Sequence, residues 1–133
     1  MKVLTKSEAK RMSPGALAFY GDSVYSLLVR RMLVEQGDRP SAALHELSVG
    51  YVRASFQAKA FETLQPLLGE DEADILRRGR NSTGITAPKS SDPAEYHKAT
   101  AVEALFGYLS LIGDNERLES LFAAVTENIP ERK

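Results

Sequence analysis

Hydrophobic residues recur at helical spacing along most of the chain, and the segments they form have recognisable start and stop residues. Ser13 and Pro14 open the first long segment and Gly37 closes it, which predicts a helix of about 22 residues. Its apolar side chains lie on two faces: Leu17, Tyr20, Val24 and Leu28 on one, and Phe19, Tyr25, Val29 and Leu33 on the other. A helix that is apolar on both faces is expected at the centre of its fold.

Two further helical segments follow this central one. The first runs from Pro40 and Ser41 to about Leu68, is bent or broken near Gly50, and has apolar residues at helical spacing: Leu44, Leu47, Tyr51, Val52, Phe56, Ala60 and Leu64. The second is short. Glu70 and Asp71 stand at its start and three arginines collect at its end, which is the charge order that a helix dipole favours.

The last third of the chain contains one long loop and two more helices. Residues 81–91 are small and polar, include glycine and proline, and show no periodicity, which predicts a loop. Asp92, Pro93 and Glu95 have the pattern of a capping box for a helix that Gly113 ends, and an amphipathic helix is expected from about Asp114 to Thr126. No alternating pattern competes with these helices, so we expect an all-α fold.

Length and composition limit the class of protein. A chain of 133 residues with 43% hydrophobic residues is sufficient for one domain, which we place over residues 1–133 with its core at about 13–126. The sequence has no cysteine, which excludes disulfides and thiolate zinc sites and suits a reducing cytoplasm. We expect no membrane span, because no apolar run approaches about 18 residues. No glycine-rich phosphate loop is present, and we expect no organic cofactor.

Positive charge is concentrated in one segment although the whole chain has a net charge of −1. Between positions 77 and 91 there are three arginines and one lysine and no acidic residue. These side chains could simply complement the dipole of the preceding helix. The adjoining loop of about 11 residues favours a functional role instead, because long irregular loops in small domains are often functional.

Two carboxylates lie within otherwise apolar helical segments: Asp22, in FYGDSVY, and Glu103, in ATAVEALFGYL. A buried carboxylate normally has a partner, a metal ion or a raised pKa, although either residue alone could be a satisfied structural acid. Small residues surround both, so that a second backbone or a substrate could approach them. Two oxygen ligands from different helices, with space for water, suit Mg²⁺.

These two motifs resemble the two signatures of ribonuclease III domains, namely Gly-Asp followed by a small and an apolar residue, and an acid followed by Ala-Leu and a small residue. The segment LRRGRN before the polar loop adds to the resemblance. The chain is most similar to the Mini-ribonuclease III branch, in which the catalytic domain has no double-stranded-RNA-binding domain. Ribonuclease III domains in general have two further acids, at the positions of Ala18 and Thr100 here, and Mini-type sequences share both replacements.

The resemblance implies a ribonuclease III-like helical bundle that forms a homodimer and cleaves double-stranded RNA with Mg²⁺, leaving 5′-phosphate and 3′-hydroxyl ends. It assigns catalysis and metal binding to Asp22 and Glu103, and it implies maturation of large-subunit (23S) ribosomal RNA precursor as the cellular task. RNA contacts are expected from the basic segment and its loop, at Arg78, Arg80, Asn81 and Lys89, because such side chains recognise the shape of A-form RNA.

Two other hypotheses remain open from the sequence. One is a non-catalytic, ribosome-associated RNA-binding protein of the same fold, which the presence of both Asp22 and Glu103 disfavours. The other is a helical interaction module without an RNA role, which the near-neutral net charge favours and the local positive charge disfavours.

Overall fold

The computed structural model describes residues 1–83 and 86–127, and every regular element in these ranges is helical. The helices are α1 (Lys6–Lys10), α2 (Pro14–Gln36), α3 (Ser41–Val52), α4 (Ala54–Leu64), α5 (Glu70–Arg80), α6 (Pro93–Leu111) and α7 (Asn115–Glu127), with a short 3₁₀ helix, η1 (Gln65–Leu67), after α4. The predicted all-α class is therefore confirmed. No helix in the described ranges is both long and apolar enough to cross a membrane.

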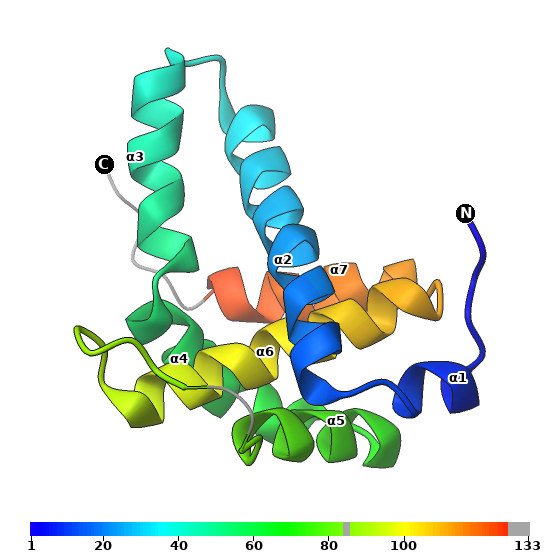
Figure 1. Cartoon of the computed structure of the whole chain (residues 1–133). Helices are drawn as coiled ribbons and strands as arrows, with labels where there is room; N and C mark the ends of the chain where they lie inside the picture. The colour runs from blue at the N-terminus through cyan, green and yellow to red at the C-terminus, as the bar shows by residue number, and fades with distance from the viewer. Residues whose placement is uncertain (84–85, 128–133) are drawn as a thin grey trace.

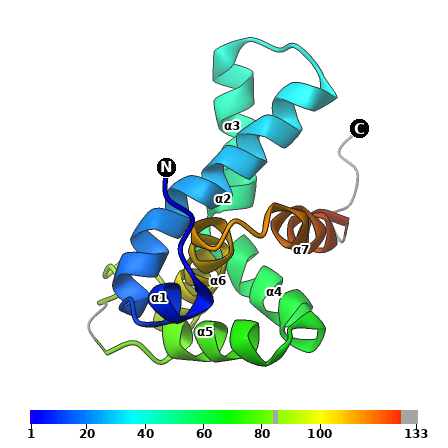
Figure 2. The same ribbon diagram turned by 90° about the vertical axis from the view of Figure 1, so that its right-hand side faces the viewer.

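Helix α6 occupies the centre of the fold and packs mainly against α2, α4 and α5 (Figures 1 and 2). From Ala99 to Leu109 nearly every side chain of α6 is buried, Glu103 being the exception. The distal halves of α2 and α3 form an antiparallel hairpin that projects from this core (Figure 1). The sequence pattern indicated α2 as the central helix, but the structure gives that position to α6.

Local residue chemistry accounts for the helix boundaries. The Ser13 side chain accepts a hydrogen bond from the backbone N–H of Ala16, Pro14 occupies the first helical position, and α2 ends before Gly37, as predicted. Asp92 likewise accepts from the N–H of Ala94 at the start of α6. After α6, Gly113 adopts a φ of 73°, which favours glycine, and the chain turns into α7.

The break within the second helical region lies at Arg53, three residues beyond the expected position. Arg53 has extended backbone angles, φ −66° and ψ 151°, and separates α3 from α4. The five-residue helix α1 was not predicted. It is stabilised by a reciprocal cap in which the Glu8 N–H donates to Thr5 Oγ1 and the Thr5 N–H donates to the Glu8 carboxylate.

Only part of the apolar surface of α2 is buried in the monomer. Leu17, Val24, Tyr25, Val29 and Leu33 are at most 8% exposed, whereas Phe19 is 86% exposed, Leu27 65% and Val34 60%. At 100° per residue these three exposed positions lie on one side of the helix. The structure of the single chain therefore leaves an apolar face on α2 uncovered.

Candidate active site

Helices α2 and α6 meet in direct backbone contact at two glycines. A Cβ atom added to Gly21 would lie 1.6 Å from the carbonyl oxygen of Glu103, and one added to Gly107 would lie 2.2 Å from the carbonyl oxygen of Leu17. Any side chain larger than hydrogen at either position would push the helices apart. The small residues noted in the sequence thus allow a close helix crossing.

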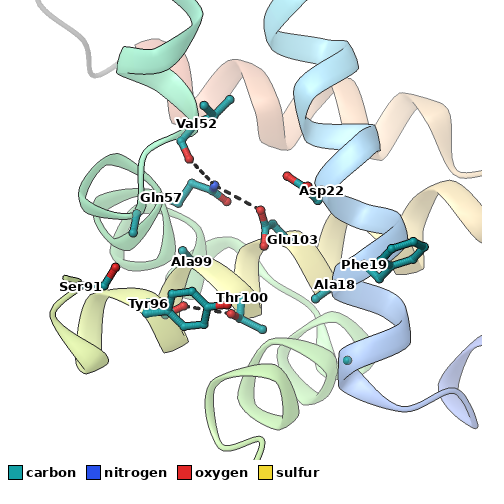
Figure 3. Close-up of a pocket in the computed structure, with 12 residues that line it drawn as sticks. Ala18, Phe19, Asp22, Val52, Gln57, Ser91, Tyr96, Ala99, Thr100 and Glu103 are labelled. Atoms are coloured by element: carbon teal, nitrogen blue, oxygen red, sulfur yellow. Dashed lines mark hydrogen bonds between the residues drawn. The ribbon is translucent and has the colours of Figure 1, made fainter. Parts of the chain in front are cut away.

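This crossing brings the two candidate catalytic acids together. Asp22 follows Gly21 on α2, and Glu103 lies one turn before Gly107 on α6. Figure 3 shows their carboxyl groups on facing sides of the same space, although 81 positions separate the residues in the sequence. Asp22 is exposed and Glu103 half-buried, so solvent and substrate can reach the pair.

The acids open onto a cavity of about 480 Å³ between α2, α4 and the first half of α6. Gly15, Ala18 and Ala99 contribute small surfaces to its wall, and Phe19 and Tyr96 contribute aromatic ones. Ala18 and Thr100, the two positions at which the resemblance led us to expect further acids in other ribonuclease III domains, also line this cavity. Within the described ranges, no group of three or more acidic, histidine or cysteine side chains is arranged to hold a metal ion.

The electrostatics of the pair favour a cation. Burial and, secondarily, the negative charge of Asp22 raise the pKa of Glu103 to about 8, while a hydrogen bond from Gln57 offsets part of the rise. The ionised form of Glu103 is therefore unfavourable in the protein alone. A bound divalent cation would reverse this, because it would neutralise both carboxylates.

Sequence reasoning missed Gln57, which approaches the acids from α4. Its side chain is only 3% exposed, it lines the same cavity, and its Nε2 donates to the Glu103 carboxylate at 3.4 Å. A signal was present in the sequence. Gln57 lies at helical spacing from Phe61 and Leu64, which makes it a polar residue on the buried stripe of α4.

A second hollow, of about 600 Å³, adjoins the cavity and shares Gly15 with it. Its walls include Arg77, Arg78 and Asn81, at the end of α5, and Ser13 at the start of α2. Two of the four expected RNA contacts, Arg78 and Asn81, therefore line a hollow next to the cavity of the acids. This hollow, called the groove below, is lined by basic and polar side chains at the end of α5 and meets the cavity of the acids at Gly15.

Arg78 also has a structural role. Its guanidinium donates to the backbone carbonyl oxygens of Lys10 at 2.9 Å and of Met12 at 3.1 Å, and so ties α5 to the junction of α1 and α2. This junction leads directly into the N-cap of α2. Arg78 therefore supports the start of the helix that carries Asp22.

The other two expected RNA contacts lie outside both hollows. The Arg80 guanidinium lies 5.8 Å from the centroid of the Phe61 ring, which fits a cation–π contact. Lys89 is exposed in the loop that leads to α6. Both side chains are on the surface, and neither contacts the acids directly.

Comparisons with known proteins agree with this geometry. Residues 15–114 match the family described as the Ribonuclease III domain, and this range contains both acids and most of the residues that line the groove. The chain belongs to this family, whose members are endoribonucleases of the ribonuclease III type. Its relatives within the family are Mini-ribonuclease 3 proteins.

Two relatives and one solved structure show the extent of the similarity. The chain is 43% identical to Mini-ribonuclease 3 of Thermoanaerobacter sp. over 98% of its own length and 92% of the relative's. It is 45% identical to Mini-ribonuclease 3 of Symbiobacterium thermophilum over 89% and 91% of the two chains. A crystal structure of a Fusobacterium nucleatum protein matches with a TM-score of 0.79 and 28% identity, covering 87% of this chain and 94% of that one.

Proposed function

We propose that the protein cleaves double-stranded RNA by Mg²⁺-dependent phosphodiester hydrolysis at the cavity where Asp22 and Glu103 meet. The observation that carries this proposal is the convergence of two carboxylates from different helices, with no cationic side chain among the described residues paired with either. Such a pair is unfavourable by itself, as the raised pKa of Glu103 indicates. Families of this fold are typically metal-dependent, and Mg²⁺ commonly binds through one or two carboxylates and retains several waters.

The donor set fits Mg²⁺ chemically. Asp22 and Glu103 would provide hard, anionic oxygen ligands, and the small residues Ala18 and Ala99 leave room in the cavity for water and a phosphate. When bound, Mg²⁺ would supply a Lewis acid that activates an attacking water and stabilises charge on the phosphate. Glu103 would have to release its proton before binding the ion, so its raised pKa couples metal binding to pH.

We assign RNA binding to the groove beside the acids and to the loop that follows it. Arg78 and Asn81 line the groove, while Arg80, at the end of α5, and Lys89, in the following loop, are exposed outside it. Arginine, lysine and asparagine contact phosphates and 2′-hydroxyl groups, which carry the shape of an A-form duplex rather than its sequence. These residues would therefore position a duplex so that a phosphate enters the cavity.

We propose that the functional form is a homodimer. The exposed apolar face of α2, formed by Phe19, Leu27 and Val34, is of the kind that another copy of the chain would cover. Phe19 also lines the cavity, so a partner seated on this face would approach the active site. A two-fold dimer would present two equivalent acid pairs, one to each strand of a duplex.

The family suggests the cellular substrate. Relatives named Mini-ribonuclease 3 resemble the chain along nearly its full length, and on this basis we propose cytoplasmic maturation of large-subunit (23S) ribosomal RNA precursor.

A cleavage assay tests the proposal. Purified protein is incubated with a perfectly paired RNA duplex and with its separated strands, first with Mg²⁺ and then with excess EDTA. We expect cleavage of the duplex only, in Mg²⁺ only, with 5′-phosphate ends. Binding without cleavage would instead support a non-catalytic RNA-binding protein, and the absence of binding would support an interaction module without an RNA role.

A further inference from the structure

Gln57 shares the cavity with Asp22 and Glu103, and its hydrogen bonds fix the orientation of its side chain. The break between α3 and α4 at Arg53 leaves the carbonyl of Val52 without a helical N–H partner, because the N–H of Phe56 bonds to the carbonyl of Arg53. Gln57 Nε2 donates to the Val52 carbonyl oxygen at 2.9 Å. A carbonyl can only accept, so the nitrogen of the amide must be the atom on this side.

The same nitrogen also reaches the active-site acid. Gln57 Nε2 lies 3.4 Å from the Glu103 carboxylate, so one amide group connects the end of α3 with the acid on α6 (Figure 3). The contact spans two helices that are separate in the sequence. Gln57 thereby restricts the orientation of the Glu103 carboxyl group.

The oxygen of the Gln57 amide is left without a partner. Oε1 is buried and makes no hydrogen bond within the described residues, in a side chain that is only 3% exposed. A buried acceptor without a hydrogen bond costs about 1–3 kcal/mol, so such an atom normally has a ligand or an ordered water. The amide end of Gln57 points toward Glu103 (Figure 3), so Oε1 lies beside the acid pair, covered by its neighbours in the metal-free protein.

We propose that Gln57 is a positioning residue of the metal site. It would hold Glu103 through Nε2, and when Glu103 turns toward a bound Mg²⁺ and uncovers Oε1, this oxygen would accept a hydrogen bond from the hydration shell of the ion. The inference rests on the proposed function, since it requires that Asp22 and Glu103 bind Mg²⁺. Gln57 would thereby add a neutral oxygen to the site beside the two carboxylates. Residues that orient metal ligands in this way commonly change metal affinity by about 10- to 100-fold when they are replaced.

The test measures Mg²⁺ binding without RNA, as the rise in melting temperature during a Mg²⁺ titration of the purified protein. Gln57→Met keeps the length of the side chain but removes both polar atoms, and we expect it to weaken Mg²⁺ binding by about 10-fold or more. Gln57→Glu keeps an oxygen toward the ion but removes the donor. We expect it to be less stable than wild type in EDTA and to gain a larger melting-temperature rise from Mg²⁺.

Ser48→Ala is the matched control, because it removes another buried polar group, on α3, whose hydroxyl donates to the carbonyl of His45 and lies outside the cavity. It should leave the Mg²⁺ response unchanged. A merely structural role of Gln57 would lower the stability of both Gln57 variants without altering the shift that Mg²⁺ produces, and this result would overturn the inference. If Gln57→Met does not fold, the Gln57→Glu variant decides: a melting-temperature shift in Mg²⁺ equal to that of wild type would overturn the inference.

The outcomes also separate this inference from the proposed function. If wild type shows no Mg²⁺ response and cuts duplex RNA in EDTA, the proposed metal site is wrong and the inference falls with it. If wild type responds and Asp22→Asn does not, the metal site stands. In that case a Gln57→Met protein that binds Mg²⁺ with unchanged affinity overturns the role of Gln57 alone.

Discussion

Gly21 of α2 and Gly107 of α6 lie against each other. A methyl group added to either glycine would collide with the backbone of the other helix. The Cβ position of Gly107 is 3.0 Å from the backbone nitrogen of Gly21, and that of Gly21 is 2.9 Å from the backbone nitrogen of Gly107. This contact sets the separation between the helices that carry Asp22 and Glu103. The geometry of the acid pair therefore depends on two residues that have no side chain.

Gly21→Ala should accordingly impair both folding and activity. The added methyl group would overlap the Glu103 carbonyl, which is backbone and cannot rotate away, so we expect a loss of about 1–3 kcal/mol or more in unfolding free energy. Gly15→Ala is the control on the same helix, since nothing lies within 4 Å of its Cβ position, and it should be neutral or stabilising by up to about 1 kcal/mol. Urea unfolding of both variants checks this, and equal stabilities would show that the crossing tolerates a side chain.

The stability of the metal-free protein should fall as pH rises through the range set by Glu103. In the folded chain the pKa of Glu103 is about 8, against an ordinary value of 4.5. Below pH 4.5 the carboxyl is neutral in both states. Between the two pKa values the unfolded chain ionises while the folded chain retains its proton, so the folded state loses relative stability. Above about pH 8 the loss is complete.

Glu103→Gln removes this ionisable group, so its stability should not show this loss. The difference in unfolding free energy between Glu103→Gln and wild type should therefore shift in favour of the variant between about pH 5 and about pH 8.5, which lie on either side of the folded-state pKa. The measurement is urea unfolding in EDTA at both pH values, with Glu119→Gln, on the exposed side of α7, as the matched control. A difference between Glu103→Gln and wild type that is the same at both pH values would contradict the raised pKa.

The helix boundaries were predictable where a single residue type fixes the backbone. Ser13 and Pro14 opened α2, Gly37 closed it, and Gly113 ended the turn after α6, because caps and positive φ values are properties of individual residues. Helix α1 was missed because five residues are too few to show periodicity, although the Thr5 and Glu8 cap was present in the sequence.

The facing arrangement of Asp22 and Glu103 came from the resemblance and from their small neighbours, not from periodicity. Gln57 could not be assigned, because its role depends on a helix break at Arg53 that frees the Val52 carbonyl. The structural role of Arg78 was likewise invisible in the sequence, since its bonds reach backbone atoms more than 60 positions away. Such contacts are products of tertiary packing.

Positive charge near the groove should determine the salt dependence of RNA binding. Replacing Arg80 and Lys89 together by alanine should weaken binding to duplexes of any sequence and reduce the slope of log K against log [salt] by about 0.7–0.9 for each phosphate that the variant no longer touches. Arg78 is left in place because it also supports the fold. The control is the double replacement of Arg30 and Arg31, on the distant half of α2. An unchanged slope in the first variant would place the RNA-binding surface elsewhere.

The exposed face of α2 should mediate dimer formation. Leu27→Glu puts a charge at the middle of this face, away from the acids, and should yield monomers of about 14.6 kDa that no longer cut both strands in one binding event. Leu67→Glu, at an exposed leucine on η1, should remain dimeric. Sedimentation of metal-free protein at low micromolar concentration checks both variants. A monomeric wild type that makes double-strand cuts in one binding event would exclude the dimer and the two-site arrangement.

The most direct test of the central claim is single-turnover cleavage of an RNA duplex at saturating Mg²⁺ by wild type, Asp22→Asn and Glu103→Gln. Each substitution keeps the size of the side chain and removes one anionic ligand, and loss of a charge-stabilising group of this kind costs about 100-fold or more in rate. We predict such a loss in both variants, with wild-type helix content by circular dichroism. Cleavage by either variant at a rate close to that of wild type would contradict the assignment of the active site to Asp22 and Glu103.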